Sequence, residues 1–132
     1  MPPADERFAM PTVLAVAVMG GLGALARYGL DRALARPGVT FPWATVLANV
    51  SGSFLIGLLF ALAIERSHGP SWVRLGLSVG LLGGFTTFST FSLQTFRLIE
   101  NGSHGAAIGN ALGSLALGLV AVTIGVVVGR AF

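Results

Sequence analysis

Long apolar runs alternate along this chain with short clusters of charge. The charged residues gather near residues 5–7, 27–36, 65–74 and 97–100 and at Arg130. Each run between clusters approaches or exceeds the ~20 residues that a helix needs to cross the hydrocarbon core of a bilayer. The pattern predicts a single all-helical transmembrane domain over residues 1–132, with helices at about 12–34, 41–64, 72–97 and 106–129.

Turn residues and interfacial aromatics support these boundaries. Pro37-Gly38 and Gly69-Pro70 interrupt the pattern between apolar runs, where such pairs favour turns. Trp43 and Trp72 open the second and third helices, and Tyr28 lies near the end of the first. Their amphipathic rings are typical of the lipid headgroup level.

Composition agrees with an integral membrane protein and narrows its chemistry. The chain is 54% hydrophobic and only 10% charged, and its mean hydropathy is +0.83. All eight basic residues are Arg, too few and too scattered to favour nucleic acid binding. The absence of Cys excludes thiolate catalysis and Cys-ligated metal sites.

Charge gives no preferred orientation in the membrane. Four Arg lie towards the face that carries the termini and four towards the opposite face, so the positive-inside rule does not decide between them. A chain without bias can insert both ways, which allows an antiparallel homodimer. The alternative, a topology fixed by subtler features, stays open.

Four helices are too few to enclose a lumen, so we expect any pore to form between subunits. Gly76, Gly80 and Gly84 repeat every four residues, as do Gly109 and Gly113. Such spacing lets helix backbones approach closely in lipid. We expect tight helix contacts at both sets, either within one subunit or between two.

The polar residues at membrane depth are neutral. No Asp, Glu, His or Lys lies in the middle of a predicted helix, and His68 and His104 fall in loops. Proton-coupled transport and enzymatic catalysis both need titratable groups at the site, so a passive pathway fits better than either. The neutral polar residues at depth are Asn49, Ser51, Ser53, Thr86, Thr87, Ser89, Thr90, Ser92, Asn110, Ser114 and Thr123.

The segment Gly83–Phe91 is the most informative part of the sequence. Paired Gly and consecutive β-branched Thr weaken a helix, and the Thr and Ser hydroxyls can satisfy the backbone groups that a break would free. Unwound carbonyls at mid-membrane can hold a monovalent cation near Gly83 and Thr86. A kinked but continuous helix is the alternative.

Two further patterns suggest an anion path. Phe85, Phe88 and Phe91 recur every three residues among hydroxyls, and ring edges carry positive potential. Asn49 and Ser53 share one helix face, as do Asn110 and Ser114. Packing for the rings and interhelical hydrogen bonding for the amides and hydroxyls are the alternatives, and Asn49 is the strongest functional candidate.

Three of these motifs resemble the Fluc (CrcB) fluoride channel family. Gly20–Tyr28 is similar to the first-helix signature of that family, Asn49–Phe54 to its second-helix Asn motif, and Gly83–Phe91 to its third-helix core. The resemblance runs over essentially the whole chain. It implies a multi-pass protein of the bacterial cytoplasmic (inner) membrane, with a third helix broken at mid-membrane.

The resemblance also implies roles for particular residues. The backbone carbonyls of Gly83 and Thr86 would hold a structural Na⁺ at the centre of an antiparallel, dual-topology homodimer. Phe88 and Phe91 would line its two pores, and Asn49 would donate its amide to fluoride.

Three further positions follow from the same comparison. Thr90 and Ser114 would complete a polar track, and Arg27 would lie near an aqueous vestibule or serve helix packing. Many relatives carry Tyr four residues before the serine of the fourth helix, whereas this chain has Asn110.

The function implied is passive export of cytoplasmic fluoride down its electrochemical gradient. A small multidrug-resistance-type proton-coupled exporter is the runner-up, but that mechanism requires a Glu in the first helix, and residues 12–30 contain no acid. A non-transporting membrane scaffold is a third possibility, but it would leave the Thr and Phe residues of the segment Gly83–Phe91 unexplained.

Overall fold

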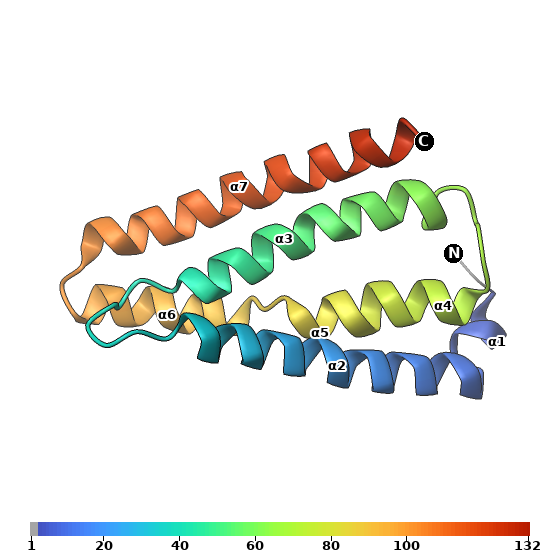
Figure 1. The fold of residues 1–132 in the computed structure, drawn as a ribbon, viewed down its shortest axis with the longest axis horizontal. Coiled ribbons are helices and arrows are strands. Elements are labelled where there is room, and N and C mark those ends of the chain that lie inside the picture. Colours follow the sequence, from blue (N-terminus) through green and yellow to red (C-terminus); the bar gives the residue numbers. More distant parts are fainter. Residues whose placement is uncertain (1–2) are drawn as a thin grey trace.

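Four long helical segments make up the fold. The computed structural model describes residues 3–132, and all regular structure within that range is helical. The segments Met10–Leu34, Trp43–Ile64, Ser71–Glu100 and His104–Arg130 are each long and apolar enough to cross a membrane. In Figure 1 they run alongside one another with their connections at the two ends of the bundle. The prediction of an all-helical chain with four membrane-length helices is confirmed.

The first two segments are nearly regular helices. A short helix, α1 (Ala4–Arg7), precedes α2 (Met10–Leu34), which has Pro11 in its first turn, where the missing N–H costs nothing. The second segment begins as α3 (Trp43–Leu59) and ends in a π-helical stretch, η1 (Phe60–Ile64).

The third segment is composite and the fourth is a single helix. The third begins as α4 (Ser71–Leu75), widens into the π-helix η2 (Gly76–Leu82), and continues as α5 (Gly83–Phe85) and α6 (Ser89–Glu100). The fourth is α7 (His104–Arg130). π-Helical turns are uncommon and are frequent at functional sites.

The connections are short because glycine closes them. Gly38, Gly69 and Gly102 have φ values of +79°, +77° and +76°, in the left-handed region that side chains with a Cβ rarely adopt. Each follows the end of a helical segment, where a left-handed residue reverses the chain. These turns place neighbouring segments side by side.

Two helix pairs form most of the internal packing. α3 packs along α7, and α2 packs along η2 and α5. In the second pair, Gly76 lies against Ala15, Gly80 against Val16 and Met19, and Gly84 against the Gly20 carbonyl. The expected close contacts of this glycine series therefore occur within one subunit.

The glycines expected to pack on the fourth helix behave differently. A Cβ placed on Gly109 or Gly113 would meet no described atom within 4 Å, so the expected tight contact is absent inside the chain. The close approaches of α7 to α3 occur instead at Gly125, beside the Phe54 carbonyl, and at Gly129, beside Leu58. Gly109 and Gly113 remain available for a contact between subunits.

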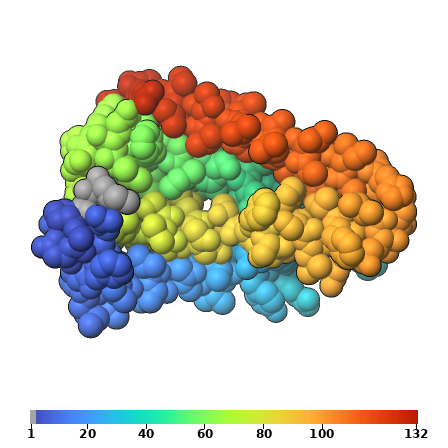
Figure 2. Space-filling view, turned by 180° about the vertical axis from the view of Figure 1, so that it is seen from behind, coloured from blue at the N-terminus to red at the C-terminus, as the bar shows by residue number. Residues whose placement is uncertain are grey.

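Most large apolar side chains point outward. Val18, Leu112 and Leu119 are 62%, 63% and 60% exposed, while the fully buried apolar residues are small ones such as Ala48 and Ala61. Figure 2 shows an elongated body, and all four segments reach the surface on the face that is seen there. Small residues between helices and large ones outside are typical of membrane bundles, since lipid covers the outer surface.

An ion pair ties the end of α7 to the chain that follows η1. Arg130 donates from Nη2 and Nε to the two carboxylate oxygens of Glu65, at 2.8 and 3.1 Å. Hydrogen bonding from Arg130 holds the pKa of Glu65 below its usual value of 4.5. The pair is solvent-exposed, so it fixes the geometry of this end more than it stabilises the fold.

The Gly23 contact provides a test of this packing. A Cβ there would meet the Leu81 carbonyl and come within 2.9 Å of the Phe85 backbone nitrogen. We predict that Gly23→Ala lowers the free energy of unfolding by about 1–3 kcal/mol, because α2 must move away from α5. Chemical unfolding in detergent would measure the change.

Gly29→Ala is the matched control, since Gly29 lies on the same helix and has no described atom within 4 Å of its Cβ position. We expect it to be at least as stable as the wild type, because Ala favours a helix more than Gly does. Equal stability of the two variants would contradict the packing described above.

Candidate functional site

The third segment leaves helical geometry between α5 and α6. Thr86 has φ −86° and ψ 159°, an extended conformation, and helical structure resumes at Ser89. Figure 1 shows this stretch as an irregular trace between the α5 and α6 labels. The Thr87 N–H, which would bond the Gly83 carbonyl in a continuous helix, donates to the Asn49 side chain instead.

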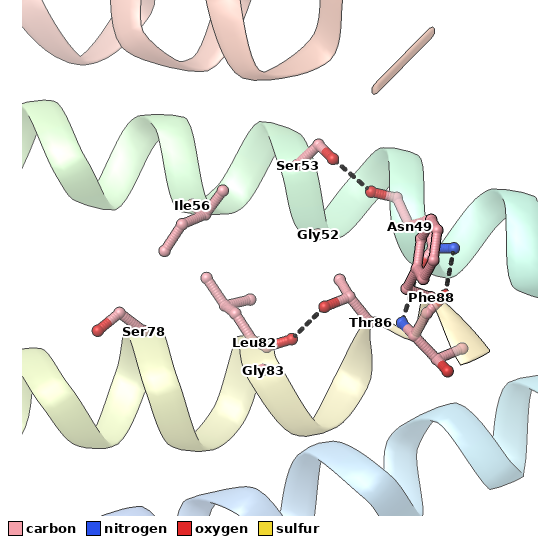
Figure 3. A pocket seen from close by; sticks show the side chains of 10 residues that line it. Asn49, Gly52, Ser53, Ile56, Ser78, Leu82, Gly83, Thr86 and Phe88 are labelled. Carbon is pink, nitrogen blue, oxygen red and sulfur yellow. Dashed lines mark hydrogen bonds between the residues drawn. The ribbon is translucent and has the colours of Figure 1, made fainter. Parts of the chain in front are cut away.

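Asn49 of α3 bridges the irregular stretch with two hydrogen bonds. Its Oδ1 accepts the Thr87 N–H at 2.8 Å, and its Nδ2 donates to the Thr87 carbonyl at 2.9 Å. Figure 3 shows the amide reaching across from α3, with dashed lines marking these bonds. An amide nitrogen has two hydrogens, so one N–H of Asn49 remains beyond this pair.

Thr87 also organises the start of α6. Its Oγ1 accepts the Thr90 N–H at 3.3 Å and donates to the Thr90 hydroxyl at 3.2 Å. This is the role of a capping side chain, which satisfies a free N–H in the first turn of a helix. The bond gives the Thr90 N–H a partner that the extended Thr86 backbone does not provide.

A cavity of about 490 Å³ lies between α3 and the third segment. Figure 3 looks into it, and from behind Figure 2 shows a small opening between the atoms of these two segments. The residues that line it are Asn49, Gly52, Ser53, Ile56, Ser78, Leu82, Gly83, Thr86, Thr87 and Phe88. Both walls of the cavity therefore carry polar and apolar side chains.

The hydroxyls of this cavity have already donated their hydrogens. Ser53 donates to the Asn49 carbonyl at 2.7 Å, Ser78 to the Arg74 carbonyl at 2.7 Å, and Thr86 to the Leu82 carbonyl at 2.9 Å. Each therefore offers only oxygen lone pairs to the cavity. Among residues 3–132, the hydrogen bond that Ser53 donates stays on its own helix and does not form the interhelical bond considered for this residue.

Phe88 and Phe91 form a ring pair at the start of α6. Their centroids are 5.8 Å apart with the ring planes tilted by 41°. Phe88 lies at the cavity and is 79% exposed, whereas Phe91 is partly covered. Tilted rings present edges, which carry the positive end of the ring quadrupole.

The sequence matches the protein family described as "CrcB-like protein, Camphor Resistance (CrcB)" over residues 14–126. This chain belongs to the CrcB family. Proteins named "Fluoride-specific ion channel FluC" are similar over nearly their full length. That of Geobacter sulfurreducens is 48% identical over 92% of this chain and 98% of the relative. That of Methylobacterium sp. (strain 4-46) is 44% identical over 93% and 99%.

The fourth helix of this CrcB protein carries a separate polar cluster. Asn110 is completely buried, and its Nδ2 donates to Thr95 Oγ1 on α6 at 2.8 Å. Ser114 donates to Asn110 Oδ1 at 3.3 Å. The alternative of interhelical bonding therefore holds for Asn110.

The expected pathway residues fall into two groups. Asn49, Thr86 and Phe88 meet at the cavity with Gly83, while Thr90 and Ser114 are not among the described residues that line it. Thr90 joins the first group through its bond to Thr87, and Ser114 belongs to the Asn110 cluster.

Arg27 also lies apart from the cavity. Its Nη1 is 3.7 Å from Asp31 Oδ2, one turn along α2, and its side chain is 27% exposed. Its Nε is buried with no hydrogen-bond partner among the described residues. These contacts are with its own helix, and they leave the choice between a vestibule and a packing role open.

Two polar residues in this CrcB chain escaped the sequence analysis. Ser78 lines the cavity from η2, and Thr95 links α6 to Asn110. Both interrupt apolar helical sequence, which is the signal that singled out the other hydroxyls. Within residues 3–132 no three Asp, Glu or His side chains gather into a metal site.

The Asn49 bridge can be tested without assuming a function. We predict that Asn49→Leu lowers the free energy of unfolding by about 1–3 kcal/mol, because it leaves the Thr87 N–H and carbonyl unpaired. Hydrogen exchange of a peptide covering residues 83–91 should accelerate in the same variant.

Ser51→Ala serves as the comparison, since Ser51 donates only to Leu47 and Ala48 of its own helix. Its exchange should match that of the wild type. Unchanged protection in Asn49→Leu would show that the amide does not hold this stretch.

Proposed function

We propose that this chain is the subunit of a fluoride-selective channel that lets cytoplasmic fluoride leave passively down its electrochemical gradient. The observation that carries the proposal is the irregular stretch at Thr86–Phe88, held by the Asn49 amide beside the Phe88–Phe91 ring pair. It occurs in a CrcB chain that is similar, over nearly its full length, to proteins named fluoride-specific ion channels.

The chemistry of the site suits a small, strongly hydrated anion. Selection of fluoride requires close donors that replace its water and narrow walls that exclude larger anions. Asn49 retains one N–H, and the ring edges of Phe88 and Phe91 supply weak positive potential nearby. A ring of Arg in the same place would admit chloride equally well.

A second copy of the chain would complete the pathway. The cavity lies at the surface of one subunit, and Phe88 at its edge is 79% exposed. No described atom of another helix lies within 4 Å of the Cβ positions of Gly109 and Gly113, which leaves α7 a face for close helix contact. An antiparallel homodimer brings two such cavities together and gives two equivalent pores.

The main chain near Thr86 suits a structural Na⁺ at the centre of that dimer. The Gly83 carbonyl lacks its helical partner because the Thr87 N–H bonds Asn49, and the Thr86 carbonyl lacks one because Thr86 is extended and has left helical geometry. Carbonyls released in this way are ligands for monovalent cations in membrane proteins. Gly83 and Thr86 of each subunit would hold the ion, which would neutralise carbonyl dipoles at mid-membrane.

The location that follows is the bacterial cytoplasmic membrane, with the third segment interrupted near the bilayer centre. The four apolar helices of the protein would span the membrane in either direction, because neither end of the bundle has an excess of Arg. The polar residues at depth are neutral, so fluoride would move without coupled proton transfer.

Fluoride efflux from liposomes tests the function directly. We predict rapid efflux of fluoride but not chloride from liposomes that contain the purified protein, measured with ion-selective electrodes. Asn49→Asp and Phe88→Ile should each slow efflux at least about tenfold, which corresponds to about 1.4 kcal/mol of barrier. The first places an anionic acceptor beside the path, and the second removes a ring edge.

Ser51→Ala should conduct like the wild type. Drug uptake that depends on a pH gradient would favour a proton-coupled exporter instead, and absence of any flux from folded protein would favour a scaffold. Either result would overturn the channel proposal.

Labelling of single introduced cysteines tests the dual topology, since the chain has no Cys of its own. Val39→Cys lies in the turn after α2, and Ser67→Cys lies in the turn at the opposite end of the bundle. In intact cells, a membrane-impermeant maleimide should label about half of each variant, because half of the copies face each way. Complete labelling of one variant and none of the other would show a fixed orientation.

A further inference from the structure

A completely buried amide connects the helix that carries the ring pair to the fourth helix. Asn110 is 0% exposed and is one of the largest fully buried side chains among residues 3–132. A neutral amide with no access to water is stable only when its donors and acceptors are paired. Its partners are Thr95 on α6 and Ser114 on α7.

These bonds extend to the backbone of Phe91. Thr95 receives the Asn110 N–H at 2.8 Å and donates its own hydrogen to the Phe91 carbonyl at 2.8 Å. Ser114 begins this series of hydrogen bonds by donating to Asn110 Oδ1. The order from α7 to α6 is therefore Ser114, Asn110, Thr95 and Phe91, and each hydroxyl hydrogen in it is used.

α6 depends on this connection more than the other helices do. It has only twelve residues, it follows the irregular stretch at Thr86–Phe88, and its main contacts are with α7. Thr95 lies one turn beyond Phe91, so a bond at Thr95 fixes how α6 is rotated about its axis. That rotation sets where the Phe91 ring points.

We propose that Asn110 is a positioning residue of the ion pathway, which holds α6 and the Ser114 hydroxyl in one fixed arrangement through its two hydrogen bonds. It acts through Thr95 and Ser114, and it does not itself line the cavity. The proposal rests on the proposed channel function for its effect on flux. The arrangement itself does not depend on that function.

Asn110→Asp gives a reversible test, because the new side chain has the same shape. When protonated it donates to Thr95 and accepts from Ser114 as Asn110 does, whereas the ionised carboxylate can only accept. We expect its fluoride turnover to be close to that of the wild type at about pH 5.5 and to fall at least about tenfold by about pH 8. Protein-free liposomes at each pH would be subtracted, because hydrogen fluoride crosses lipid unaided.

Two further variants sharpen the test. Asn110→Leu should slow fluoride turnover about tenfold at every pH, because both partners lose the amide and neither can recover it. Thr123→Val is the control on the same helix, since the Thr123 hydroxyl donates to the Leu119 carbonyl of α7 and to no other helix. It should leave turnover unchanged across the pH range.

The thermal unfolding midpoint in detergent separates this proposal from the channel function. For Asn110→Asp it should fall as pH rises, relative to the wild type, whether or not the protein conducts. A flat midpoint together with pH-independent flux would overturn the role of Asn110. A wild-type protein without fluoride flux but with the pH-dependent midpoint in the variant would overturn the channel function and keep the structural role.

Discussion

The double hydrogen bond between the Asn49 amide and Thr87 is the interaction on which the candidate site depends. An irregular stretch inside a membrane-length helix leaves backbone N–H and carbonyl groups without partners, and hydrocarbon offers no water to replace them. Asn49 supplies both a donor and an acceptor to one residue, so Thr87 is fully paired at that point.

Glycine packing puts Asn49 within reach of Thr87. Gly52, one turn along α3, lies against the Thr86 side chain, and Gly84 and Gly23 let α2 support the other side of the third segment. A larger side chain at any of these positions would separate the helices and lengthen the two hydrogen bonds between Asn49 and Thr87. The same close approaches leave little volume inside the subunit, and the cavity consequently opens at its surface.

The sequence could identify the four segments and the unusual character of Gly83–Phe91, because apolar length and local helix propensity are encoded in neighbouring residues. It could also place Asn110 and Ser114 on one face. It could not identify Thr87 as the partner of Asn49, 38 positions away, or Thr95 as the partner of Asn110, since the register between helices is set by packing. The π-helical turns of η1 and η2 have no sequence signature that would have revealed them.

The open cavity with Phe88 at its edge also bears on how the protein is made. A single subunit in a bilayer exposes the cavity and its polar side chains to acyl chains, which solvate polar groups poorly. In the proposed homodimer, pairing would remove this unfavourable lipid contact as well as form new contacts between helices. On that proposal, the abundance of the dimer would depend on how fast two copies meet in the bilayer, so the rate of synthesis would become a control point in its biogenesis.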